Sequence, residues 1–399
     1  MAKFLGKVEF PCTIQQGRGL EGAITNITQI GYVDGQAGRL VYRGCGIEDL
    51  CEHSTFEEVA YLLIFGRLPD RSELSSFRDK LRSRGRIPEA VKALITSMPK
   101  TAHPMNVLQA AVAAAGGYDE QAVEVTRHVS DPAGAVATET EVAIRVMAQT
   151  STIGAAIGRA RNGQALVEPD PELSFTENFL HMMTGQLPNE VMARVMDVCL
   201  ILQADHGMNA STFTSMVVHS SMSDLYSTIA AAIGSLRGPL HGGANELALA
   251  DMQSIDGPGS AAAWVADRMA RHDKIIGFGH RVYKAYDPRA TILKRHAEAL
   301  CREKGLADLF QTADAVEREV CAAMEKAGKK IFPNVDFYSG IVYHALGFST
   351  PMFPVIFAVA RTAGWVSRVL EYLPINRIFR PRAVYNGATD ARYVPMSER

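Results

Sequence analysis

The chain has 399 residues, of which 47% are hydrophobic and 21% are charged, an ordinary balance for a soluble globular protein with a sizeable core. Its formal net charge of -2 excludes an overall field that would attract nucleic acid or an anionic membrane, so a charge-based function must come from a local cluster. The six cysteines form no CxxC pair and are too sparse for a disulfide framework, which favours reduced thiols and a cytoplasmic location.

Two segments of the sequence bear on export and membrane insertion. Residues 1–10 contain no apolar run of the length that a signal peptide needs. The most apolar later stretch, residues 352–366, is too short for a membrane span and contains Arg361. We therefore expect no membrane partner.

The first predicted element is a small β-hairpin within residues 23–44. There, Val33-Asp34-Gly35 lies between apolar-rich flanks and Gly38 supplies a second flexible point, a pattern typical of a tight turn between two strands. After this segment the strand signal fades.

The next predicted element is a helix over residues 56–65. Ser54 or Thr55 is of the type that caps a helix N-terminus, and two glutamates occupy the first turn. We expect Leu68-Pro69 to end this helix, since proline cannot continue it.

Prolines that start or end helices recur along the chain, and the segments between them predict an almost entirely helical protein of roughly 15 to 20 helices. The prolines that precede or open a segment with helical spacing are Pro88, Pro104, Pro132, Pro188, Pro239, Pro258, Pro288 and Pro351. There is no tandem repeat and no obvious linker. If two domains exist, the chain passes between them through ordered turns, with Gly242-Gly243 and Gly347 as candidates.

Four stretches combine histidine, aspartate or asparagine with glycine, and in three of them a histidine adjoins the glycine, which lets a ligand or a second backbone approach closely. They are DHGMNAS at 205–211, PLHGGANE at 239–246, GFGH at 277–280 and PNVDFYSG at 333–340. Common motifs do not explain them. Val282 stands where a dinucleotide loop has its third glycine, and the sequence contains no P-loop, no zinc-ligand spacing and no GxSxG.

Two of these stretches carry residues suited to removing a proton next to a carbonyl group. His241 precedes Gly-Gly and a segment that starts a helix, where the positive end of the helix dipole favours a neutral, hydrogen-bond-donating imidazole. Asp336 lies between Val335 and Phe337, and partial burial would raise its pKa and make it a better general base. The alternative for Asp336 is a helix N-cap.

A local cluster of positive charge is the second indication of a ligand-binding site. Residues 268–302 contain nine Lys and Arg against three Asp and Glu, which fits an anionic ligand or a solvated helix face. Arg361 lies inside an apolar helix, so its guanidinium must pair with a protein acid or with a ligand carboxylate.

Taken together and in this order, the four stretches resemble the citrate synthase family, over nearly the whole chain from residue 19 to residue 382. PLHGGANE, GFGHRVYK followed by DPR, and PNVDFYSG carry the likeness, and YVDG with GRLVYRG near the N-terminus fits it. The resemblance implies an all-α, two-domain fold with a small N-terminal β-hairpin. It implies a large domain of residues 1–242 and 348–399 and a small domain of residues 243–347.

The resemblance also implies the reaction and its catalytic residues. Acetyl-CoA, oxaloacetate and water would give citrate and CoA without a metal or other cofactor, in a homodimer whose domains close after oxaloacetate binds. By this likeness, Asp336 removes a proton from the acetyl methyl group and His241 stabilises the resulting enol. His280 polarises the ketone of oxaloacetate.

Further roles follow from the same resemblance. The expected oxaloacetate ligands are His206, Arg289, Arg361 and Arg380, the last reaching into the site of the neighbouring subunit. The loop expected to lie against the adenine end of CoA consists of Ile275, Ile276, Gly277, Phe278 and Gly279. Asn209 and Ser211 match the family pattern near the site.

Several alternatives remain open at this point. A 2-methylcitrate synthase would use propionyl-CoA with the same residues. Propionyl-CoA is larger than acetyl-CoA by one methylene group, so the two enzymes would differ only in a slightly larger acyl pocket. An enzyme that cleaves citryl-CoA would run related chemistry in reverse. A non-catalytic anion- or nucleotide-binding protein would be expected to lack Asp336 or a histidine. A nucleic-acid binder would need residues 268–302 to form one exposed face, without aromatic stacking residues.

Overall fold

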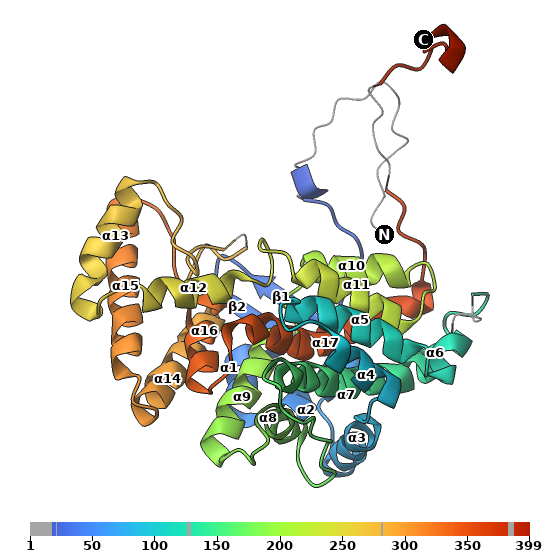
Figure 1. The fold of residues 1–399 in the computed structure, drawn as a ribbon, viewed down its shortest axis with the longest axis horizontal. Coiled ribbons are helices and arrows are strands. Elements are labelled where there is room, and N and C mark those ends of the chain that lie inside the picture. The colour runs from blue at the N-terminus through green and yellow to red at the C-terminus, as the bar shows by residue number, and fades with distance from the viewer. Residues whose placement is uncertain (1–17, 21, 126–128, 281, 382–386) are drawn as a thin grey trace. The chain divides into compact units, whose positions relative to one another are not determined.

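The computed structural model describes residues 18–20, 22–125, 129–280, 282–381 and 387–399 (Figure 1). The chain divides into two units, one of residues 28–377 and one formed by the described parts of residues 1–27 and 378–399. The smaller unit contains two short 3-10 helices, Arg18–Leu20 and Met396–Glu398.

The described part of residues 28–377 is built mainly of α-helices, which confirms the predicted all-α class. The α-helices are α1 (Ile47–His53), α2 (Phe56–Phe65), α3 (Arg71–Arg84), α4 (Glu89–Ser97), α5 (Pro104–Gly116), α6 (Glu120–Val125), α7 (Val136–Arg161), α8 (Phe175–Thr184), α9 (Glu190–Gln203), α10 (Ala210–His219), α11 (Leu225–Leu236), α12 (Ala244–Gln253), α13 (Ala261–Ala270), α14 (Pro288–Glu303), α15 (Ala307–Lys326), α16 (Val335–Ala345) and α17 (Phe353–Tyr372).

The predicted hairpin is present and continues into a third strand. Strands β1 (Gly31–Asp34), β2 (Arg39–Tyr42) and β3 (Cys45–Gly46) form an antiparallel sheet in the order β1-β2-β3. In the β1–β2 turn, the Asp34 carboxylate accepts the N–H groups of Gln36 and Ala37, and these hydrogen bonds fix the turn.

Helix α2 has the predicted limits, but its end has another cause. Thr55 and Glu58 form a reciprocal capping box at the N-terminus, as the sequence allowed. The helix stops at Gly66, whose φ of 82° is left-handed and whose N–H bonds to the carbonyl of Leu62. The prediction that Leu68-Pro69 ends the helix is wrong, because the glycine cap acts first.

Helix α17 is the central core helix of the larger unit. It packs against α2, α5, α7, α9, α10 and α11, and residues 353–370 are all buried. The stretch Thr350–Ile375 is long and apolar enough to cross a membrane by length and composition, but its most apolar window is entirely covered by protein. The apolar character of this stretch is therefore that of a core helix.

Helices α12 to α16 pack largely against one another, α12 and α14 on α16 and α13 on α15 (Figure 1, yellow to orange). They occupy residues 244–345, and the turns at Gly242-Gly243 and Gly347 flank them. Contacts of α14 with α1 and α9 join this group to the other helices. The division into domains of residues 1–242, 243–347 and 348–399 stays a prediction.

Candidate active site

Asp336 is the second residue of α16, and its carboxylate does not cap that helix. Asn334 is the N-cap, and its side-chain oxygen accepts the Asp336 N–H at 2.9 Å. The alternative interpretation of Asp336 as an N-cap is therefore wrong. Burial raises the pKa of the Asp336 carboxyl to about 6, although Arg289 and Arg361 act in the opposite direction. A carboxylate with a raised pKa binds a substrate proton better while remaining ionised at neutral pH.

His241 lies in the turn before α12 and is held by the first turn of α10. Its Nε2 accepts the Ser211 N–H at 3.2 Å and lies 2.8 Å from the Ser211 Oγ. A backbone N–H can only donate, so the proton of the neutral imidazole is on Nδ1. Burial, followed by the charge of Arg361, lowers the His241 pKa to about 4. The neutral form agrees with expectation, but the helix terminus that binds the ring belongs to α10 and not to α12.

His280 is also neutral, with the opposite tautomer. Its Nδ1 accepts the N–H groups of Val282 at 3.0 Å and Tyr283 at 3.1 Å. Nε2 therefore carries the proton and is the nitrogen that can donate to a ligand. Burial, followed by the charge of Arg289, lowers the His280 pKa to about 4.

His206 lies in the loop between α9 and α10, beside His280. The two ring centroids are 5.2 Å apart, and His206 Nε2 lies 3.2 Å from the Tyr283 hydroxyl. Burial, with nearby Arg289, holds the His206 pKa well below its ordinary value. A neutral imidazole here can exchange hydrogen bonds with a ligand without adding a third positive charge to the arginines.

Arg361 is a buried guanidinium on α17. Its Nε donates to the Gln203 carbonyl at 2.6 Å, and the guanidinium lies 4.7 Å from the centroid of the Phe357 ring. Among the described residues no carboxylate forms an ion pair with it, and burial lowers its pKa to about 10. Asp205 acts on this guanidinium through its charge but forms no ion pair with it, and a buried cation without a direct acidic contact is a good site for a ligand carboxylate.

Arg289, at the start of α14, is oriented by an acidic neighbour. Its guanidinium donates to both carboxylate oxygens of Asp287, at 3.0 and 2.8 Å, and both side chains are buried. It also lies 5.9 Å from the centroid of the Tyr283 ring. This bidentate pair fixes the guanidinium in place and leaves its other edge for further hydrogen bonds.

The GFGH turn is joined to the segment that carries Asp336. Gly279 N–H donates to the Phe332 carbonyl at 2.9 Å, and Asn334 N–H donates to the Gly277 carbonyl at 2.8 Å. Gly277 has a φ of 85°, and a Cβ there would lie 2.9 Å from that of Phe337, so only glycine fits. The glycines of this turn are therefore explained by its backbone conformation and by its close packing against Phe337. The CoA contacts of residues 275–279 stay a prediction.

The predicted catalytic and oxaloacetate residues of the larger unit share one electrostatic environment. The pKa of His206 responds to Arg289, His280, Arg361 and His241, and the pKa of Asp336 responds to Arg289 and Arg361. Arg380 belongs to the smaller unit, so its role stays a prediction.

Asn209 and Ser211, expected near the site, are positioned by α10. Asn209 caps the helix by accepting the Thr212 N–H, and it also accepts the Ser211 hydroxyl at 2.8 Å. Ser211 in turn contacts His241 and accepts the indole N–H of Trp365 at 3.2 Å. Ser211 therefore contacts the imidazole, and its N–H defines the tautomer, whereas Asn209 acts one step away by holding Ser211.

Sequence reasoning assigned no role to three residues that the structure places at the site. Tyr283 contacts His206 and His280, Asp287 orients Arg289, and Trp365 supports Ser211. Tyr283 and Asp287 lie within the GFGHRVYK and DPR motifs, so the motif itself was the available signal. Trp365 is far away in the chain and carries no such signal.

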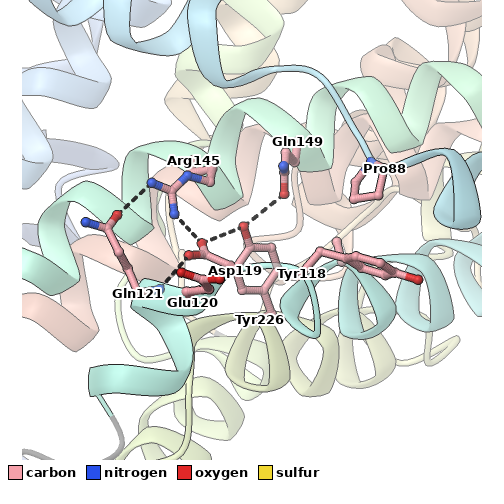
Figure 2. Close-up of a pocket in the computed structure, with 9 residues that line it drawn as sticks. Pro88, Tyr118, Asp119, Glu120, Gln121, Arg145, Gln149 and Tyr226 are labelled. Carbon is pink, nitrogen blue, oxygen red and sulfur yellow. Dashed lines mark hydrogen bonds and ion pairs between the residues drawn. The ribbon is translucent and has the colours of Figure 1, made fainter.

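A cavity of about 320 Å³ lies elsewhere, between α5, α6, α7 and α11. Figure 2 shows Asp119 accepting hydrogen bonds from Arg145 and Tyr226, while Tyr226 also bonds to Gln149. These polar groups pair with one another, and none of the sequence-predicted site residues lines the cavity. No group of three potential metal ligands occurs in the part of the chain that the structure describes.

The fold and the site define a class of protein. An almost all-helical chain that presents a carboxylate base, two neutral imidazole donors and buried arginines is equipped as an enzyme that removes a proton next to a carbonyl and binds anionic substrates.

Comparison with known proteins identifies the family. The family profile "Citrate synthase, C-terminal domain" matches residues 19–382. The chain is 42% identical over 382 residues to the citrate synthase of Deinococcus radiodurans, covering 96% of this chain and 98% of that protein. It is 41% identical to that of Synechocystis, covering 96% of this chain and 93% of that protein.

Solved structures agree. The citrate synthase of Pyrobaculum aerophilum superposes with a TM-score of 0.91 at 40% identity, covering 99% of this chain and all of that one. The ternary complex of Thermoplasma acidophilum citrate synthase with carboxymethyl coenzyme A and oxaloacetate has a TM-score of 0.86 at 34% identity, with 96% and 98% coverage. The chain belongs to the citrate synthase family, a family of acyltransferases. These relatives do not favour the 2-methylcitrate alternative.

Proposed function

We propose that the chain condenses acetyl-CoA with oxaloacetate and water to give citrate and CoA. The observation that carries the proposal is the pair of opposite, backbone-fixed tautomers at His241 and His280. The pKa values of these two rings respond to Arg361 and Arg289, the same two arginines that act on the base Asp336. The ternary complex of the Thermoplasma relative, which contains a CoA derivative and oxaloacetate, supports the same substrates.

The first step is enolisation. The Asp336 carboxylate takes a proton from the methyl group of acetyl-CoA, and His241 donates its Nδ1–H to the thioester oxygen, where negative charge develops. A thioester is a weak carbon acid, so the base alone would be poor without that donor. Loss of a donor of this kind typically costs about 10²–10³ in rate.

The second step forms the carbon–carbon bond. The enol carbon attacks the ketone carbon of oxaloacetate, and the enol O–H proton returns to His241 as the thioester carbonyl re-forms. His280 donates its Nε2–H to the ketone oxygen, which becomes a hydroxyl. Water then hydrolyses the citryl thioester to citrate and CoA, and the proton that Asp336 took from the methyl group replaces the one that His280 gave. Both imidazoles begin as neutral donors, which their lowered pKa values favour.

The carboxylates of oxaloacetate are assigned to the cationic part of the site. Arg361, which forms no ion pair with a carboxylate of the described residues, binds one carboxylate, and Arg289 contributes the edge that Asp287 leaves open. His206 adds a hydrogen bond. In a homodimer, Arg380 would be supplied to the site of the neighbouring subunit.

Two further assignments belong to the same proposal. Residues 275–279 lie against the adenine end of CoA, next to the segment that carries Asp336. A cytoplasmic location is supported by the free thiols of the five cysteines that the structure describes.

The test is thiol release by the purified protein. CoA should be released from acetyl-CoA only when oxaloacetate is present, since condensation precedes hydrolysis. Release that is independent of oxaloacetate would overturn the condensing mechanism. The ratio of kcat/KM for acetyl-CoA to that for propionyl-CoA then settles the acyl chain, and we expect it to favour acetyl-CoA.

A further inference from the structure

The turn between β1 and β2 lies directly against the loop that follows His280. The Gly35 carbonyl accepts the Lys284 N–H at 2.7 Å, a short and direct backbone hydrogen bond between segments far apart in the chain. The sheet belongs to the predicted large domain and the loop to the predicted small domain. The contact therefore spans the predicted domain boundary.

The closeness of this contact depends on glycine. A Cβ on Gly35 would lie 2.2 Å from the carbonyl oxygen of Val282, far inside van der Waals contact. A Cβ on Gly38 would lie 2.8 Å from the carbonyl oxygen of Tyr286. Gly35 does not have a positive φ, so an alanine there would meet no backbone strain and would disturb only this approach.

The loop segment held by the turn is the segment that fixes His280. Val282 and Tyr283 donate their N–H groups to His280 Nδ1, and Tyr283 also contacts His206 through its hydroxyl. On the other side, Gly279 bonds to Phe332. The loop is therefore held from two sides, and the turn supplies one of them.

The turn is itself a rigid support. Asp34 fixes its backbone, and the sheet is anchored where the Tyr42 hydroxyl donates to the Asp205 carbonyl at 2.8 Å. Asp205 forms a buried ion pair with Arg368 at 2.7 Å and directly precedes His206. The same anchored sheet thus locates the backbone at His206 and the loop at His280.

We propose that the β1–β2 turn is a positioning element for His280, acting through the Gly35 carbonyl and the glycine-only approach to residues 282–286. This inference rests on the proposed function. Because catalytic donors must be held within a fraction of an ångström, displacement of the loop by about 1 Å can cost up to about 10²-fold in rate.

The test is Gly35→Ala, with Gly259→Ala as the matched control. Gly259 is exposed, has no positive φ, and a Cβ there would meet no atom within 4 Å. We expect kcat/KM for oxaloacetate to fall by about ten- to a hundredfold in Gly35→Ala, with a smaller change in the KM for acetyl-CoA. The control should match the unaltered protein.

Thermal unfolding with and without oxaloacetate separates positioning from a merely structural role. Without oxaloacetate, Gly35→Ala should unfold at nearly the wild-type temperature, whereas the stabilisation that oxaloacetate gives should shrink. Unchanged kinetics would overturn the inference, and so would a variant that fails to fold or loses the same stability in both conditions. If the wild-type protein itself showed no oxaloacetate-dependent release of CoA, the proposed function would fail instead.

Discussion

His241 and His280 are neutral imidazoles whose protons lie on different ring nitrogens. A backbone N–H occupies Nε2 of His241, and two occupy Nδ1 of His280. Each ring therefore keeps one donor, and the fold decides which nitrogen carries it. Residue type alone could not distinguish the two roles.

Asp336→Asn tests the assignment of the base. The amide keeps the shape of the side chain but cannot take a proton, so we expect turnover to fall by about 10²–10⁴-fold while oxaloacetate binds almost normally. Steady-state kinetics and titration calorimetry measure the two quantities. If the affinity for oxaloacetate fell as far as turnover, Asp336 would be a binding residue and the assignment would be wrong.

The raised pKa of Asp336 also sets a pH dependence. The base must be ionised to act, and burial raises its pKa to about 6, so activity should decline as pH falls through that value. We expect kcat/KM for acetyl-CoA to drop about tenfold per pH unit on the acidic side. An acidic limb centred near 4, the range of an ordinary carboxyl, would contradict the effect of burial.

Arg361→Leu tests the carboxylate site on α17. Removal of a buried, charge-assisted donor should raise the KM for oxaloacetate at least tenfold, about 1.4 kcal/mol of binding free energy. Arg318→Leu is a suitable control, because Arg318 is exposed on α15 and pairs with Asp314 of its own helix. An unchanged KM in a folded Arg361→Leu protein would remove Arg361 from the site.

At the scale of elements, the sequence was sufficient to predict those features whose hydrogen bonds join residues close together in the chain. The β1–β2 turn and the Thr55 cap of α2 were predictable, since their hydrogen bonds lie within a few residues. Where two capping types occur close together, as at Asn334 and Asp336, propensity cannot choose between them. In the structure Asn334 is the N-cap, so the carboxylate of Asp336 is not used to cap the helix.

Helices α7 and α10 contain a buried pair with no evident role in the chemistry. Glu139 and His219 are buried, their nearest polar atoms are 3.8 Å apart, and neither carboxylate oxygen of Glu139 has a hydrogen-bond partner. Burial raises the pKa of Glu139 to about 8, with Asp224 and Asp119 acting in the same direction. Burial lowers the pKa of His219 to about 4.

The sign of the resulting pH dependence follows from Glu139. Unfolded, it ionises near its ordinary pKa of 4.5, whereas the folded chain keeps the proton up to about pH 8. The stability that it contributes is fully present below pH 4.5 and is lost as pH rises toward 8, by about 1.4 kcal/mol per unit of pKa difference. His219 acts oppositely, and its burial costs stability as pH falls below 6.5.

Glu139→Gln should therefore flatten this dependence. Gln cannot ionise, so we expect the free energy of unfolding to fall less between pH 5 and pH 8 in the variant than in the wild type. Urea unfolding at several pH values measures the free energy of unfolding of each protein. Glu319→Gln, at an exposed position of α15, is the control. Equal declines in variant and wild type would show that Glu139 is ionised in the folded protein.

At the scale of the whole molecule, the site draws on segments that the sequence keeps far apart. The loop after α9, the turn before α12, the start of α14, the start of α16 and the middle of α17 each contribute a residue. Motif resemblance named these residues, but their hydrogen bonds depend on packing between helices. Contacts such as Trp365 on Ser211, or Gly35 on Lys284, have no local signal in the sequence.

Arg380 is proposed to act in the active site of the neighbouring subunit. A test of this role therefore needs a dimer that combines two different variants. Arg380→Leu and Asp336→Asn should each be nearly inactive alone. When the two variants are co-expressed, a mixed dimer would hold one doubly altered site and one intact site, provided that Arg380 crosses the interface.

In the mixed dimer one of the two sites is intact, so about half of the wild-type specific activity should return. If Arg380 served its own subunit, every site would carry one defect and no activity would return. The measurement is the specific activity of the co-purified, doubly tagged dimer. Retention of the sample on both affinity tags in succession shows that the two variants have paired.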